Sequence, residues 1–176
     1  VTGRASRVLV VLPSSLQHQW LVEMLRRFNL KFAIFDDSRC EAEVATQDDG
    51  GDESNNIFDN EQLIFVSQEW LAENGKWQQQ ITQCQWDLVV IDEAHHISPP
   101  EQDSNNDAAQ TNEGALYSVI QNLGKATAGL ILLTATPDQL GHYGHFKRLQ
   151  LLDPNRFHDY QTYVHEEGQY KAIASI

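Results

Sequence analysis

The feature that most constrains this fold is a pair of apolar segments that each end in a short polar sequence. One is Trp86-Asp87-Leu88-Val89-Val90-Ile91, which is followed by Asp92-Glu93-Ala94-His95. The other is Leu130-Ile131-Leu132-Leu133, which is followed by Thr134-Ala135-Thr136-Pro137. Such runs are typical of buried strands in a parallel sheet. Because open α/β sheets bind ligands at the carboxyl ends of their strands, the polar endings predict functional groups there.

Three further apolar segments, residues 7–13, 31–35 and 62–67, also favour strands. The segment after residue 13 has apolar side chains close to a 3.6-residue period, and residues 116–123 form a second amphipathic pattern that stops at Gly124. Strands that alternate with helices imply βαβ crossovers. The sequence therefore predicts an α/β fold, with a parallel sheet and helices on both faces.

The negative charge is concentrated in one segment. The formal net charge is −13, and residues 36–61 contain ten acidic side chains and one base, Arg39. Because this composition is typical of a polar surface insertion, residues 46–60 are expected to be flexible, as are residues 98–113, which are rich in Asn, Gln and Asp. A docking surface for a basic partner is the alternative interpretation of the acidic segment.

The remaining composition favours an ordinary cytosolic domain. A length of 176 residues and a hydrophobic content of 41% suit one globular domain. Cys40 and Cys84 lack C-x-x-C spacing, so both are predicted to be unpaired thiols. No apolar segment reaches the roughly 18 residues of a membrane span, and we expect no signal peptide. The four tryptophans are interpreted as packing residues rather than base-stacking platforms.

The adjacent carboxylates fit a nucleotide-hydrolysis site. An aspartate at the end of a buried strand can coordinate the Mg²⁺ that bridges the β- and γ-phosphates, and this is the role predicted for Asp92. Glu93 can orient and deprotonate the attacking water. A D-E-A-H sequence alone can also be a solvated helix start. The separate strand that ends in Thr134 and Thr136 favours the hydrolase, because hydroxyls there can sense the γ-phosphate.

The chain resembles the first RecA-like domain of superfamily 2 helicases and translocases. Asp92-Glu93-Ala94-His95 is similar to motif II, and Thr134-Ala135-Thr136 is similar to motif III. Residues 11–25 resemble motif Ia of the Swi/Snf-type branch, in which a proline-ended strand leads into a helix that carries Trp20 and Glu23. Residues 16–30, 92–96 and 132–160 are also similar to bacterial ATPases that associate with RNA polymerase.

This resemblance implies a three-layer RecA-like fold and a role for each matching position. Asp92 would bind magnesium, Glu93 would be the general base, and His95 with Thr134 and Thr136 would couple the nucleotide state to nucleic acid. The residues implied along a DNA backbone are Pro13, Ser14, Ser15 and, in the motif Ib position, Ser67. The resemblance also implies ATP and Mg²⁺ as cofactors, RNA polymerase and duplex DNA as partners, and a nucleoid-associated location in the bacterial cytoplasm.

One element of the family pattern is absent. A phosphate-binding loop reads G-x-x-x-x-G-K-[ST], and neither Gly75-Lys76 nor Gly124-Lys125 has the earlier glycine or the following hydroxyl. We therefore expect residues 1–176 to be a partial helicase ATP-binding domain, with motifs Ia to III but without the P-loop strand. Alone, it is expected neither to bind ATP tightly nor to hydrolyse it. The alternatives are a non-catalytic RecA-like module that docks a partner through its acidic surface, and another DEAH-type superfamily 2 helicase.

Overall fold

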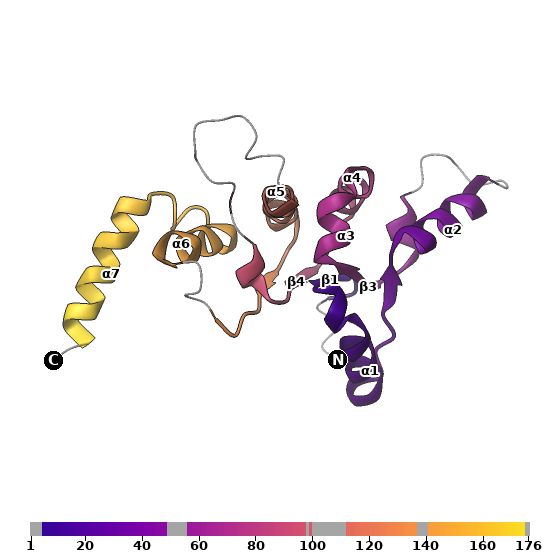
Figure 1. Ribbon diagram of the computed structural model, residues 1–176, viewed down its shortest axis with the longest axis horizontal. Coiled ribbons are helices and arrows are strands. Elements are labelled where there is room, and N and C mark those ends of the chain that lie inside the picture. Colours follow the sequence, from indigo (N-terminus) through magenta and orange to yellow (C-terminus); the bar gives the residue numbers. More distant parts are fainter. Residues whose placement is uncertain (1–4, 49–55, 98, 100–111, 137–140, 175–176) are drawn as a thin grey trace.

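A computed structural model describes residues 5–48, 56–97, 99, 112–136 and 141–174. Within these residues, five strands form one sheet in the order β2-β3-β1-β4-β5 (Figure 1). The strands are β1 (Val8–Leu12), β2 (Ala33–Phe35), β3 (Leu63–Ser67), β4 (Leu88–Ile91) and β5 (Leu130–Leu132). Each neighbouring pair is parallel, so the predicted α/β class is confirmed.

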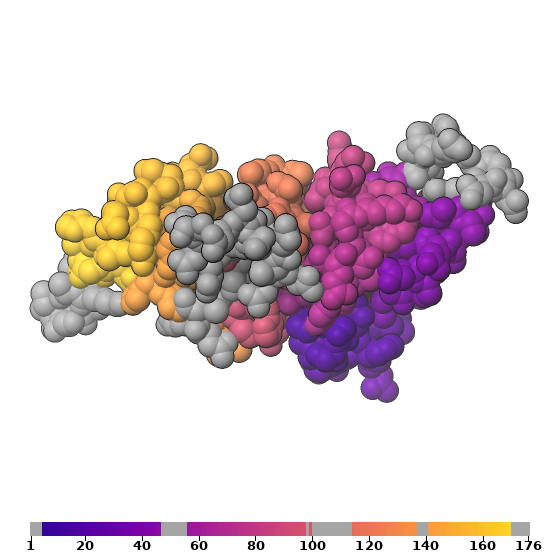
Figure 2. Space-filling view, turned by 45° about the horizontal axis from the view of Figure 1, so that its top comes forward, coloured from indigo at the N-terminus to yellow at the C-terminus, as the bar shows by residue number. Residues whose placement is uncertain are grey.

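Helices cover both faces of the sheet, as predicted (Figure 1). On one face lies α1 (Gln17–Phe28), and on the other lie α3 (Gln68–Glu73), α4 (Gly75–Gln83) and α5 (Asn112–Ala126). The remaining helices are α2 (Asp37–Asp48), α6 (Gly141–Leu152) and α7 (Tyr160–Ala174), and short 3₁₀ turns are η1 (Ser14–Leu16), η2 (Ile57–Asn60) and η3 (Ala94–His96). In Figures 1 and 2, α2 and α7 lie at opposite ends of an elongated molecule.

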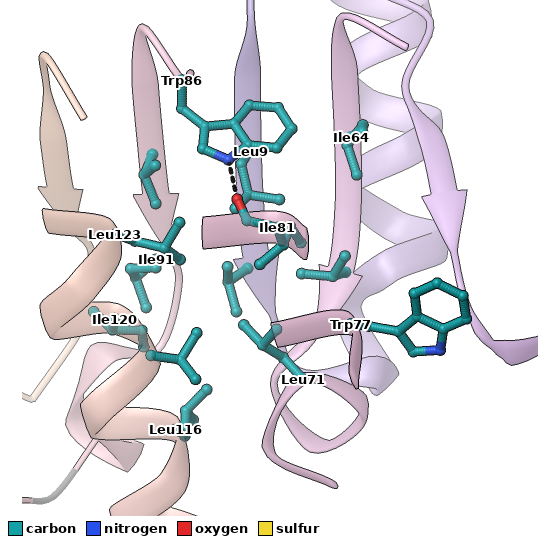
Figure 3. Packing of buried hydrophobic residues seen from close by; sticks show 14 of the residues in the cluster. Leu9, Ile64, Leu71, Trp77, Ile81, Trp86, Ile91, Leu116, Ile120 and Leu123 are labelled. Carbon is teal, nitrogen blue, oxygen red and sulfur yellow. Dashed lines mark hydrogen bonds between the residues drawn. The ribbon is translucent and has the colours of Figure 1, made fainter. Parts of the chain in front are cut away.

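Successive side chains along the strands pack alternately into two separate cores, one on each face of the sheet. Leu9, Ile64 and Ile91 are fully buried on the face covered by α3, α4 and α5 (Figure 3). Val10 and Phe65 point to the opposite face and pack under α1. This alternation follows from the two-residue period of a strand. Each fully buried aliphatic side chain contributes about 1.5–3 kcal/mol, so the sheet anchors the loops at its carboxyl edge firmly.

The tryptophans and cysteines mostly serve packing. Trp70, Trp77 and Trp86 are buried, and the Trp86 indole donates to the main-chain oxygen of Ile81 at 2.8 Å (Figure 3), which confirms the packing interpretation for these three. The two thiols, Cys40 and Cys84, are buried and unpaired, as predicted. Burial raises the pKa of each thiol to about 12.

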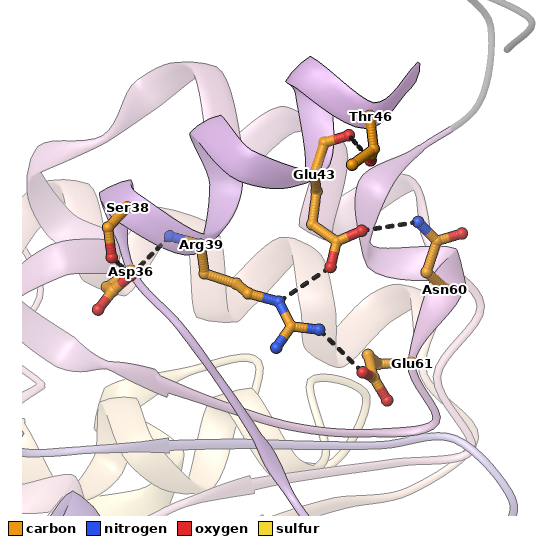
Figure 4. Close-up of polar contacts among 7 residues, drawn as sticks. All are labelled: Asp36, Ser38, Arg39, Glu43, Thr46, Asn60 and Glu61. Carbon is orange, nitrogen blue, oxygen red and sulfur yellow. Dashed lines mark hydrogen bonds and ion pairs between the residues drawn. The ribbon is translucent and has the colours of Figure 1, made fainter. Parts of the chain in front are cut away.

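The acidic segment is more structured than its composition predicts. Residues 37–48 form α2, and the single base of the segment organises its carboxylates (Figure 4). Arg39 forms ion pairs of 2.9 Å with both Glu43 and Glu61, and the Asn60 amide donates to Glu43 at 3.1 Å. Part of the negative charge is therefore already neutralised within the fold.

The expected bounds of both insertions need correction. Residues 46–48 belong to α2, and residues 57–60 form η2, where Ile57 and Phe58 are almost completely buried. Phe58 packs between Phe35 and Trp77, with ring centroids 5.0 and 6.4 Å apart, so this apolar pair anchors the segment to the core. Residues 49–55 lie outside the described residues. Of the second insertion, residues 112 and 113 belong to α5, and residues 98 and 100–111 lie outside the description.

Among the described helices, none is both long enough and apolar enough to cross a membrane.

The strands are shorter than the apolar segments that predicted them. The fifth, for example, covers residues 130–132, whereas its apolar segment extends to Leu133.

Candidate nucleotide-hydrolysis site

The D-E-A-H segment leaves β4 between β1 and the end of β5. The Asp92 amide donates to the main-chain oxygen of Val11 at 2.8 Å, which continues the β1–β4 pairing by one residue. The Ala94 amide donates to the oxygen of Leu133 at 2.8 Å. These bonds fix the backbone on both sides of Glu93, so both carboxylates arise from a rigid edge of the sheet.

Three donors hold Asp92. The indole Nε1 of Trp20 donates to Oδ2 at 2.9 Å, and the Glu93 amide donates to Oδ1 at 2.9 Å. The side-chain amide of Gln68, which is only 5% exposed, donates to the main-chain oxygen of Asp92 at 2.6 Å. The sequence singled out Trp20 only as part of motif Ia and gave no signal for Gln68, because both contacts depend on the tertiary fold.

Glu93 has a left-handed backbone conformation, with φ 48° and ψ 47°. For an L-residue with a Cβ atom this conformation costs roughly 1–2 kcal/mol. Asp92 and the Ala94–Leu133 bond stabilise it from either side. Backbone strain that the surrounding structure maintains in this way is common at functional sites.

His95 connects the two strand endings singled out in the sequence. Its Nδ1 lies 3.1 Å from Glu93 Oε2 and 3.3 Å from the Thr134 hydroxyl. The Thr134 hydroxyl in turn accepts from the Thr136 amide at 3.1 Å. The structure therefore brings four of the predicted site residues into one connected group, and the remaining carboxylate, that of Asp92, directly precedes Glu93 in the chain.

The predicted nucleic-acid residues fall into two groups. Ser14 and Ser15 are exposed beyond the carboxyl end of β1, just after Pro13, and the Ser14 amide donates to Glu69 Oε2 at 3.1 Å. Ser67 differs, because it is only 7% exposed and its hydroxyl caps α3 by accepting from the Trp70 amide at 3.0 Å. The structure thus gives Ser67 a helix-capping role and does not bring it to the exposed group.

A cavity of about 240 Å³ opens beside this edge of the sheet. Its lining includes Gln68, Glu69, Glu73 and His96. Two carboxylates in one small cavity repel an anion. The cavity is therefore poorly suited to the phosphates of a nucleotide, in keeping with the missing phosphate-binding loop.

The donor set suits magnesium that is held mainly by a substrate. The Asp92 carboxylate supplies hard oxygen ligands, and Mg²⁺ commonly takes one or two carboxylates together with phosphates and waters rather than an all-protein cage. In the described part of the chain, no three His, Cys, Asp or Glu side chains gather as a metal site. His142, which lies far along the chain, instead pairs with Glu167 at 2.9 Å.

Comparison with known proteins identifies the family. Residues 1–169 match the model of the SNF2-related domain. The chain belongs to this family. The RNA polymerase-associated protein RapA of Yersinia pseudotuberculosis serotype O:1b (strain IP 31758) is 47% identical to it over 174 residues. RapA of Actinobacillus pleuropneumoniae serotype 3 (strain JL03) is also 47% identical over 174 residues.

This SNF2-related domain is short in comparison with those relatives. The alignment covers 99% of the chain but 16% of the Yersinia protein, and 98% of the chain but 17% of the Actinobacillus protein. The Swi/Snf-type resemblance of the sequence is confirmed and is favoured over another DEAH-type branch.

Proposed function

We propose that this SNF2-related domain supplies the carboxylate half of the ATP site of a longer, DNA-translocating ATPase that associates with RNA polymerase. The observation that carries the proposal is the connected group at the carboxyl edge of the sheet, in which Glu93 contacts His95 and His95 contacts Thr134. This group joins motif II to motif III. The RNA polymerase association rests on the printed names of the relatives.

In this proposal each residue of the group has a defined task. Asp92 holds Mg²⁺, which when bound with ATP would neutralise developing phosphate charge. Glu93 orients and deprotonates the attacking water. His95 lies close to both Glu93 and Thr134 through Nδ1, so a movement of Glu93 would change the positions of Thr134 and Thr136. The phosphate-binding loop and the cationic groups at the γ-phosphate would come from other parts of the longer protein.

The proposed DNA contact is made by Pro13, Ser14 and Ser15. The two serines are exposed and Pro13 is half-buried, and serine hydroxyls suit a phosphate backbone. Ser67 would support this contact indirectly by capping α3. With 12 lysines and arginines against 25 acidic residues, the chain alone offers little counterion release, so we expect it to bind DNA weakly. The bacterial cytoplasm, at the nucleoid, is the proposed location of the longer protein.

The test is DNA-stimulated ATP hydrolysis by the longer protein and its Glu93→Gln variant. If Glu93 is the general base, the variant should lose about 10³-fold in kcat, because a positioned base contributes roughly 10²–10⁴-fold. Binding of ATP should persist, since the amide retains the size of the side chain. The 176-residue chain alone should show no turnover.

Glu61→Gln is the matched control, because Glu61 pairs with Arg39 in the acidic segment and not with the site. It should hydrolyse ATP at close to the wild-type rate. Full activity of the Glu93→Gln protein, or magnesium-dependent turnover by the isolated chain, would overturn the proposal.

A further inference from the structure

One contact at the site comes from α1, a helix that carries none of the predicted catalytic or metal-binding residues. Trp20 lies on α1, on the far side of the sheet from α3 and α5, and its indole nitrogen lies 2.9 Å from Asp92 Oδ2. The ring is half-buried and packs edge-on against Phe65, with centroids 6.4 Å apart and planes at 77°. The packing fixes the ring, so the direction of its N–H bond is fixed as well.

The two oxygens of Asp92 are each held by one N–H donor. Trp20 donates to Oδ2 and the Glu93 amide donates to Oδ1. A carboxylate oxygen has two lone-pair sites, so each oxygen keeps one for a metal ion or its water. The carboxylate is therefore oriented before any metal arrives, and a single rotation about its side-chain bonds would break both contacts.

The chemistry of the donor matters too. A lysine or arginine at this position would also hold the carboxylate, but its positive charge would repel a divalent cation only a few ångströms away. An indole N–H orients the carboxylate without adding charge. Partners of this kind, which hold a metal ligand without touching the metal, typically change metal affinity or activity about 10–100-fold when removed.

We infer that Trp20 is a positioning residue for magnesium, which acts by holding the Asp92 carboxylate in the orientation that receives the ion. The inference rests on the proposed metal role of Asp92. It assigns the tryptophan of the α1 segment a task beyond packing. It also ties α1, which follows the proposed DNA-contacting residues directly, to the metal ligand.

The chain contains its own control for the removal of an indole–carboxylate bond. Trp70 donates from its indole nitrogen to Asp37 Oδ1 at 2.8 Å, in the part of the fold where α2 meets α3. Trp20→Phe and Trp70→Phe therefore remove the same kind of bond, and only the first bond involves the proposed metal ligand. If Trp20→Phe does not fold, replacement of Trp20 by benzothienylalanine removes the N–H donor and keeps the bicyclic shape.

The experiment is a titration of the 176-residue chain with Mn²⁺, a paramagnetic substitute for Mg²⁺, followed by broadening of backbone amide signals in ¹H–¹⁵N NMR spectra. Because no substrate phosphates are present and Asp92 is the single proposed ligand, the titration extends to the high Mn²⁺ concentrations that such a weak site requires. The expected result is broadening of the Glu93 amide signal in the wild type and its loss in Asp92→Asn. Trp20→Phe should need about 10-fold more Mn²⁺ for equal broadening. Trp70→Phe should match the wild type.

Two other results would count against the inference in different ways. If the wild type and Trp20→Phe need the same Mn²⁺ concentration for equal broadening, the role of Trp20 is overturned and the metal role of Asp92 stays intact. If the Glu93 amide signal does not broaden in the wild type, or broadens to the same extent in Asp92→Asn, the metal role of Asp92 is overturned, and the inference with it.

Discussion

At the scale of single residues, Glu93 shows how the fold enforces a site at a cost in stability. Its positive φ is unfavourable for any residue with a Cβ atom, and the flanking hydrogen bonds of Asp92 and Ala94 hold it there. In return, its carboxylate lies 3.1 Å from Nδ1 of His95. Glycine would adopt this conformation without steric cost, so glutamate is the less stable choice here, which fits the catalytic role that we propose for it.

This strain can be measured by comparing Glu93→Gly with Glu93→Ala. Both variants remove the carboxylate and its contact with His95, and they differ mainly in the Cβ atom. We expect the glycine variant to be more stable by about 1 kcal/mol in free energy of unfolding, because glycine adopts positive φ without steric cost. Urea denaturation followed by circular dichroism measures the difference. An alanine variant that is more stable than the glycine variant, as at an ordinary unstrained position, would show that the backbone here is not strained.

At the scale of elements, the start of β1 is fastened to the start of β4 by one side chain. Asp87 accepts hydrogen bonds from the amides of Ser6 and Arg7, at 2.6 and 2.9 Å. Arg7 extends the connection, since its guanidinium pairs with Asp59 at 2.8 Å and lies 5.1 Å from the Trp86 ring centroid. The amino ends of two central strands are thus aligned, which sets the register of their carboxyl ends at the site.

The Arg7 amide first, and then the Ser6 amide, lower the pKa of Asp87. Because the folded pKa lies below the unfolded value, this stabilisation is present above about pH 4 and is lost as the pH falls through the folded pKa. Asp87→Asn should therefore lower Tm at pH 7, and the difference from wild type should shrink below pH 4. Thermal melts across this range test it, with Glu41→Gln, at an exposed position on α2, as the control. A difference that is independent of pH would contradict the role of the charge.

The elements also show what sequence patterns can and cannot reveal. Continuous apolar runs predicted all five strands, because buried parallel strands need apolar side chains on both faces. The acidic composition of residues 36–61 concealed α2, whose charges are offset by Arg39. It also concealed the anchoring pair Ile57 and Phe58, because two apolar residues are too few to form a period.

At the scale of the whole molecule, the site is assembled from segments that are distant in the chain. The motif residues Asp92, Glu93 and His95 could be predicted because they are contiguous and follow a strand. The Trp20–Asp92 contact spans 72 residues and the His95–Thr134 contact spans 39, so both depend on the sheet order β1-β4-β5. Ser67 illustrates the converse, because a motif position alone did not reveal that its hydroxyl caps a helix.

The central claim is that this domain carries only the carboxylate half of an ATP site. The most direct measurement is the sequence of the reading frame that precedes Val1, over about fifty codons, a length suggested by the size of one βαβ unit. We predict a G-x-x-x-x-G-K-[ST] loop directly after an apolar strand, which would complete the site around Asp92 and Glu93. A start codon at Val1, or a loop there without its lysine and hydroxyl, would contradict the claim.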